Sequence, residues 1–145
     1  MVIAVLVLGI AVPPTLNMMD SASAGRVDAI NTTRATYLTT IVLETVMADM
    51  TSNHASLGFD ALGESAVYLS AQNTGLYDRL TTIVQPYSDV GFNYSVTIGE
   101  LVSFDGLVSE IESDNIFRTI TVTVRYASAS GEEFAMPTWL MVSEL

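Results

Sequence analysis

The chemistry available to this chain centres on one histidine and on scattered carboxylates. His54 is the only histidine, and the chain contains no cysteine. Thiol catalysis, disulfides and thiolate metal sites are therefore excluded, and a catalytic triad or histidine metal cluster would have to use one imidazole. Because His54 follows a long helical pattern, we predict that it lies at the surface near the C-terminal end of a helix, a position that suits histidine. We assign no catalytic, cofactor-binding or metal-ligating residue.

Acidic residues gather between two predicted strands, at Asp105, Glu110, Glu112 and Asp114. Carboxylate oxygens are ligands that calcium prefers, but this spacing departs from the Asp-x-Asp-x-Asp-Gly pattern of a calcium loop. A solvated loop is the favoured prediction, and a calcium site stays open as the alternative. Paired carboxylates also serve glycosidases, although 16 acidic residues in a chain of 145 produce many chance pairs. We expect no enzyme activity.

The charge balance argues against two further classes of protein. The net charge is -11, from 16 acidic and 5 basic residues, and every basic residue is an arginine. A chain without lysine cannot form a Walker-type phosphate loop or a lysine Schiff base. Because no basic cluster is present, we expect no nucleic-acid partner, and we expect no cofactor.

An uninterrupted apolar run opens the sequence over residues 1–12 and is followed by Pro13 and Pro14. Twelve helical residues rise about 18 Å, less than the roughly 30 Å of a bilayer core. Three interpretations are open: a buried core element, a signal peptide cleaved after Ala24, and a membrane stem that begins upstream of Met1. The stem is preferred, because the run has no amphipathic period and no basic residue precedes it.

In the stem interpretation, the apolar side chains of the run mediate membrane insertion and assembly. A kink or local melting is expected at its end, because each proline removes a helical hydrogen bond and crowds the carbonyl four residues earlier. The preceding glycine makes the segment easier to deform. The stem residues are Val2, Ile3, Val5, Leu6, Val7, Leu8, Ile10 and Val12, and the kink residues are Gly9, Pro13 and Pro14.

An amphipathic pattern continues the helix to about Asn53, and no proline interrupts residues 21–50. Its apolar positions recur at helical spacing, so we predict that they pack on a sheet. The stripe consists of Val27, Ile30, Arg34, Tyr37, Ile41 and Ala48, and it is widened by Leu38, Val42, Val46 and Met50.

The C-terminal third predicts an antiparallel sheet. Residues 92–98 and 118–126 alternate between apolar and polar side chains, which is typical of strands. A third strand over residues 134–142 contains Pro137, which favours an edge strand or a bulge. Three aromatic residues are expected to pack the sheet rather than bind a ligand: Tyr126, Phe134 and Trp139.

The predicted fold class is α+β, with a long, Pro-kinked N-terminal helix packed on a small antiparallel β-meander. Four segments follow from these patterns. They are the hydrophobic stem and kink (1–24), the amphipathic continuation of the helix (25–53), an irregular connector with short helical turns (54–91) and the antiparallel sheet (92–145).

This order of elements resembles that of type IV pilins and pseudopilins. Residues 2–14 look like the stem of a prepilin just after its cleavage motif, and residues 34–49 resemble the continuing helix of minor pseudopilins. Residues 121–126, 130–133 and 136–141 resemble the last two strands of the minor subunit called I in type II secretion systems. The basic leader and the Phe-Thr-Leu-X-Glu block of prepilins are absent here, so no residue is assigned the role of the family's assembly glutamate. We expect codons for that block upstream of Met1.

The resemblance implies a structural subunit, a minor pilin or pseudopilin, of a type IV pilus or type II secretion filament. It implies processing by a prepilin peptidase, insertion in inner-membrane lipid, and assembly with other pilin or pseudopilin subunits by an assembly platform. The C-terminal domain would lie in the periplasm or at the cell surface of a bacterium. The alternative is a small exported or membrane-anchored binding module with a cleaved signal peptide.

Overall fold

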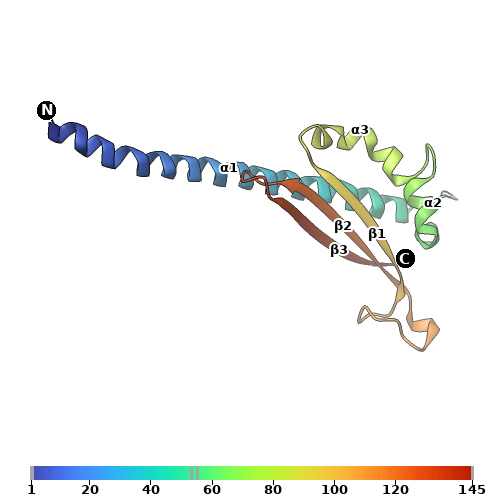
Figure 1. Ribbon diagram of the computed structural model, residues 1–145. Coiled ribbons are helices and arrows are strands. Elements are labelled where there is room, and N and C mark those ends of the chain that lie inside the picture. Colours follow the sequence, from blue (N-terminus) through green and yellow to red (C-terminus); the bar gives the residue numbers. More distant parts are fainter. Residues whose placement is uncertain (1, 53, 55, 145) are drawn as a thin grey trace.

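The computed structural model describes the backbone of residues 2–52, 54 and 56–144, and within those ranges it describes side chains from Leu16 onward. The fold is α+β, as predicted (Figure 1). In chain order the elements are α1 (Val2–Met50), the 3-10 helix η1 (Asp60–Glu64), α2 (Ser65–Ser70), α3 (Leu76–Ser88), β1 (Asn93–Val102), the 3-10 helix η2 (Glu112–Asp114), β2 (Phe117–Ala127) and β3 (Glu133–Ser143).

Helix α1 is 49 residues long, and its N-terminal part projects away from the rest of the protein, which we call the head (Figure 1). The helix is continuous through Pro13 and Pro14. The side chains of the predicted stem and kink residues lie outside the described ones, so their roles in assembly and bending stay predictions. Among the described residues, no helix carries an apolar stretch long enough for a membrane crossing.

The sheet has the order β1-β2-β3, and both pairs are antiparallel. Val122 on the central strand lies opposite Val96 on one side and Thr138 on the other. Every second residue of β2 is buried, as the alternation predicted: Ile120, Val122, Val124 and Tyr126. Pro137 lies on an edge strand, as expected, and the β2–β3 register continues past it without a shift.

The face of α1 that packs on the head is one part of the predicted stripe. Leu38, Val42 and Val46 are buried, as expected, and Ile41 and Met50 are partly buried against the core. The buried helix residues are Ala35, Leu38, Val42 and Val46, whereas Tyr37 is 62% exposed. Five other members of the stripe were expected to pack on the sheet but are exposed: Val27, Ile30, Arg34, Tyr37 and Ala48. The two faces are separated by roughly 110° around the helix. Both faces carry apolar residues at helical spacing, so the sequence pattern does not distinguish them.

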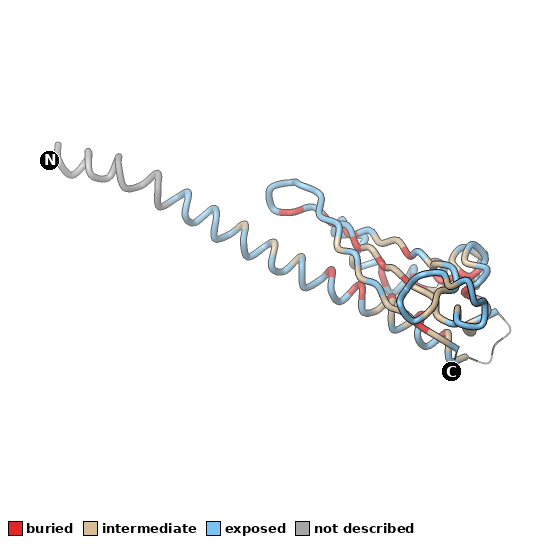
Figure 2. The backbone as a smooth tube through the Cα atoms, turned by 90° about the horizontal axis from the view of Figure 1, so that it is seen from below, coloured by how far each residue is buried: buried red, intermediate tan, exposed pale blue. Residues whose placement is uncertain are grey.

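The connector is more regular than predicted. Helix α3 has 13 residues, more than the short helical turns expected in this segment, and contains Pro86. Its buried residues, Leu76, Leu80 and Val84, join the inner faces of α1 and the sheet in one core. Figure 2 shows this core as the buried positions between the second half of α1 and the strands.

Candidate assembly surfaces

The residues that could have supported catalysis are spread over the surface. His54 is exposed beyond the end of α1, and its ring Nδ1 lies 2.9 Å from the Ser56 hydroxyl. A surface pocket beside it is lined by residues that include Leu57, Phe59 and Glu144. In the part of the chain that the structure describes, no three histidine or acidic residues gather as a metal site would require. The carboxylates between β1 and β2 are all exposed.

The tightest polar cluster of the head was not predicted. Arg79 on α3 donates two hydrogen bonds to Asp49 on α1, from Nη1 to Oδ1 at 2.7 Å and from Nη2 to Oδ2 at 2.6 Å. The hydroxyl of Tyr68 on α2 donates to the same Oδ2 at 2.6 Å. The guanidinium also lies 5.9 Å from the centre of the Tyr68 ring, within reach of a cation–π interaction.

This cluster ties three helices together. Burial, and then the hydrogen bond to Asp49, raises the pKa of Tyr68, so that the phenol stays a donor. The hydrogen bonds to Asp49 likewise raise the pKa of Arg79. A sequence signal for the cluster existed, because Asp49 continues the buried positions Val42 and Val46 at helical spacing. A carboxylate on a buried helix face requires a partner, since an unpaired buried charge is costly.

One side of α1 carries a line of exposed residues, which we call the outer stripe. Its members follow one another at steps of three or four, with Ser23 between the second and third, a spacing close to that of coiled-coil seams. Leu16 is 54% exposed and Ile30 is 50% exposed. Figure 2 shows that the N-terminal part of the helix projects clear of the head. Asp28 contacts the head, where its side chain accepts a hydrogen bond from the Ala129 amide at 2.8 Å. The outer stripe consists of Leu16, Met19, Val27, Ile30, Arg34 and Tyr37.

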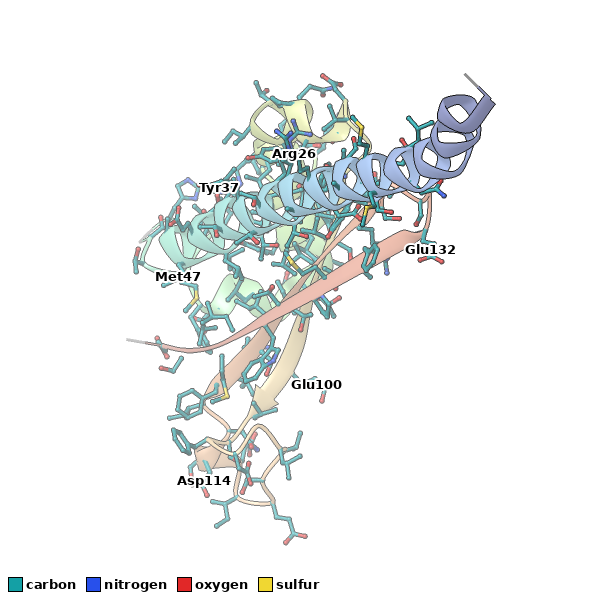
Figure 3. The ribbon with its side chains drawn as sticks, turned by 90° about the vertical axis from the view of Figure 1, so that its left-hand side faces the viewer. Arg26, Tyr37, Met47, Glu100, Asp114 and Glu132 are labelled. Atoms are coloured by element: carbon teal, nitrogen blue, oxygen red, sulfur yellow. The ribbon has the colours of Figure 1, made fainter. Side chains whose placement is uncertain are left out.

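Two of the five arginines, Arg26 and Arg34, lie on α1, and Arg34 belongs to the outer stripe. Arg79 is bound to Asp49, Arg118 donates to the carbonyl of Gly99, and Arg125 lies 3.7 Å from Glu133. The remaining arginines, Arg26 and Arg34, form no ion pair with any residue that the structure describes. Both belong to α1, and Figure 3 shows Arg26 and Tyr37 along that helix. Helix α1 of this strongly acidic chain therefore presents two arginines without an ion-pair partner among the described residues.

A groove lies between Arg34 and the C-terminal end of α3. It is lined by Arg34, Pro86, Tyr87 and Val90, and we call it the Arg34 groove. Val90 is 55% exposed. The groove combines one cation with apolar side chains, so it suits a ligand segment that is apolar and negatively charged.

The loop between β1 and β2, residues 103–116, has that complementary composition. Its apolar side chains are mostly exposed, and they alternate with the acidic residues noted in the sequence. Asn115 fixes the loop by accepting a hydrogen bond from the Ser109 amide and donating one to the Ser109 carbonyl. Hydrogen bonds from Ser103 and the Leu107 amide lower the pKa of Asp105. The exposed apolar residues are Phe104, Leu107, Val108, Ile111 and Ile116.

The aromatic residues of the sheet follow the prediction only in part. Tyr126 is buried and stacks on Phe92, with ring centres 5.2 Å apart. Phe134 is half exposed but stacks on Tyr126 at 5.9 Å. Trp139 was expected to pack the sheet, which is wrong: it is 70% exposed on the outer face, opposite Thr121. The one-residue offset from Leu140 turns its side chain to the uncovered face of the edge strand.

Comparisons with protein-family models, with curated proteins and with solved structures found no match to this chain.

Proposed function

We propose that this chain is a structural subunit that assembles with other subunits through its N-terminal helix, as a minor pilin or pseudopilin of a type IV pilus or type II secretion filament does. The observation that carries the proposal is the outer stripe, a mostly apolar line on α1 whose members are all exposed among the described residues. It runs from Leu16 to Tyr37, so its last members lie beside the buried helix residues Ala35 and Leu38.

The projecting helix supports the proposal energetically. An isolated helix segment is marginal in water, and most helical stability in proteins comes from packing of an amphipathic face. Residues 16–27 of α1 have almost no packing partner in the head, since all but Ala24 are exposed. Burial of Leu16, Val27 and Ile30 against a neighbouring helix would contribute about 1.5–3 kcal/mol for each side chain that becomes fully buried.

Hydroxyl groups on α1 fit the same role. Thr32, Thr33, Thr36 and Thr40 each donate to the carbonyl four residues earlier, at 2.9–3.0 Å. A hydroxyl that is satisfied within its own helix can enter a helix–helix interface without leaving an unpaired donor. These hydroxyls therefore do not prevent the neighbouring outer stripe from packing against another helix.

In this proposal the helices of neighbouring subunits pack in the filament core while the heads face outward. The apolar run of residues 1–12 favours insertion in the inner membrane as a single pass, with the head in the periplasm or at the cell surface. Processing by a prepilin peptidase and extraction by an assembly platform complete the proposed path. The role is structural and requires no cofactor.

The native N-terminus of the protein in membrane fractions tests the processing step. Mass spectrometry is expected to find a methylated residue upstream of Met1. A native terminus at Gly25 would identify an exported binding module with a cleaved signal peptide and would overturn the filament proposal.

A charged substitution in the outer stripe, made in cells that express the protein, tests its role in assembly. Ile30→Glu is expected to remove the subunit from the sheared or pelleted filament fraction while the thermal unfolding temperature stays the same. Thr40→Glu is the matched control, because Thr40 is exposed on a different side of the same helix. Equal recovery of both variants in the filament fraction would show that the stripe is not an assembly surface.

A further inference from the structure

Two surfaces of this protein are complementary in both polarity and charge, and they belong to different ends of the head. The β1–β2 loop is apolar and acidic, whereas the Arg34 groove is apolar and basic. We propose that the β1–β2 loop of one copy docks in the Arg34 groove of a second copy, so that heads join in a head-to-tail series. This inference rests on the proposed function, since it names a contact between subunits of the same assembly.

The charge distribution selects a second copy as the occupant. The chain has 16 acidic and 5 basic residues, so copies of it repel one another unless a local cation meets a local acid. Arg34 has no ion-pair partner among the described residues, and Glu110 and Glu112 lie exposed in the loop. Opposite charges beside apolar contacts set the register of an interface and disfavour mismatched orientations.

The placement of the two surfaces favours a repeating contact. In Figure 1 the loop lies near the end of the head where α1 ends, whereas the C-terminal end of α3 lies nearer the projecting stem. Figure 3 also shows the loop, marked by Asp114, away from α1. Each copy can therefore offer its loop to one neighbour and its groove to another. Such a contact is heterologous, and a heterologous contact that does not close into a ring builds an open filament.

The loop is shaped before it binds. Asp105 accepts hydrogen bonds from the Ser103 hydroxyl and the Leu107 amide, and the two-way Asn115–Ser109 pair closes the other half. The Phe104 ring packs against the Phe117 ring with centres 6.1 Å apart. A loop held in one conformation loses less entropy when it docks, which favours affinity. The contact is small, so we expect it to be weak alone and effective where stem packing holds neighbouring heads together.

Cross-linking of the full-length chain in mild detergent tests the contact. The chain contains no cysteine, so single substitutions give unique attachment points. Val90→Cys marks the groove and Val108→Cys marks the loop, and both side chains are exposed. An equal mixture of these two variants is expected to form a cross-linked dimer with a bismaleimide. Val90→Cys mixed with Glu132→Cys is the control, because Glu132 lies in the β2–β3 turn away from the loop (Figure 3).

Charge reversal then tests the recognition. Arg34→Glu in the groove copy is expected to lower the cross-linked yield about fivefold, and Glu110→Arg in the loop copy is expected to restore it. A yield no higher than the Glu132→Cys control, or a yield that Arg34→Glu leaves unchanged, would overturn the inference. Capture of a different protein by Val108→Cys in cells, without the dimer, would overturn it as well.

The two proposals fail separately. Loss of the cross-link while Ile30→Glu still blocks filament recovery would reject the loop–groove contact and leave helix-driven assembly in place. A cross-link that persists while Ile30→Glu has no effect would reject assembly through the outer stripe.

Discussion

Substitution of Asp49 is expected to destabilise the head more than any substitution of an exposed acidic residue. Asp49→Asn keeps the size of the side chain but removes the negative charge that binds Arg79 and accepts the Tyr68 hydroxyl. Arg79 would then lie against a neutral amide, and at least one of its two strong hydrogen bonds would be lost.

The expected cost follows from burial. Removing one partner of a buried ion pair costs about 3–5 kcal/mol, because the other charge is left uncompensated. The Asp49 side chain is 8% exposed and the Arg79 side chain is 28% exposed, so water can partly solvate the remaining guanidinium. The lower end, about 3 kcal/mol, is therefore expected. For a chain of 145 residues this corresponds to a fall of about 10 °C in the unfolding temperature.

Thermal unfolding of the full-length chain in mild detergent, followed by circular dichroism, measures this change. Asp20→Asn is the control, since Asp20 is exposed on the projecting part of α1. The double variant Asp49→Asn, Arg79→Met is expected to recover part of the loss, because it removes the unpaired cation along with its partner. An unfolding temperature for Asp49→Asn within about 2 °C of the control would refute the assignment of a buried, paired Asp49.

Three further outcomes are expected from the same measurements. Gly75→Ala should lower the free energy of unfolding by about 3 kcal/mol, because a Cβ there would lie 2.6–2.8 Å from backbone atoms of Ala71 and Leu69. Gly25→Ala, with open space around it, should raise helix stability by about 0.5–1 kcal/mol. Equal effects of the two substitutions would contradict the packing at Gly75. Leu38→Ala should lower the free energy of unfolding by about 2–5 kcal/mol, because Leu38 is buried. Tyr37→Ala should change it by no more than about 0.5 kcal/mol, because Tyr37 is exposed. A larger loss for Tyr37→Ala than for Leu38→Ala would mean that α1 is rotated. Burial, with a smaller contribution from Tyr77, raises the pKa of Tyr94 to about 12. The unfolded chain ionises first, so the contribution of Tyr94 to stability is complete below about pH 10 and is lost as pH rises from about 10 to about 12. Tyr94→Phe should flatten the alkaline fall in unfolding temperature, and an unchanged slope would contradict the assignment.

The strands and the long helix were predictable because their signals are local. Alternation over residues 118–126 fixes which side chains of β2 face the core, and Pro137 identifies the edge strand. The orientation of α1 was predictable only in part: Leu38, Val42 and Val46 are buried as expected, but the broad apolar pattern also included Val27, Ile30 and Tyr37, which are exposed. The Arg79–Asp49 pair joins residues 30 positions apart, and the sequence offers only the position of Asp49 on the buried face as a clue. The exposure of Trp139 depends on one residue of register in β3, which the unbroken apolar run of residues 139–142 does not define.

The polar cluster and the two faces of α1 are connected. Rotation of the helix by roughly 110° would bring the outer stripe onto the sheet, bury Arg34 and carry Asp49 away from Arg79. At the axial level of the sheet, Tyr37 and Ala48 would take the places of Leu38 and Val46. Two charges would then lose their favourable surroundings, so the ion pair contributes to the choice of face even where its net effect on stability is small. The double variant Asp49→Asn, Arg79→Met removes that bias, and hydrogen exchange along α1 reports the result. We expect the amides around Leu38 to lose protection in the double variant more than the sheet amides do, and equal protection of both would show that sheet packing alone sets the orientation that leaves the outer stripe free.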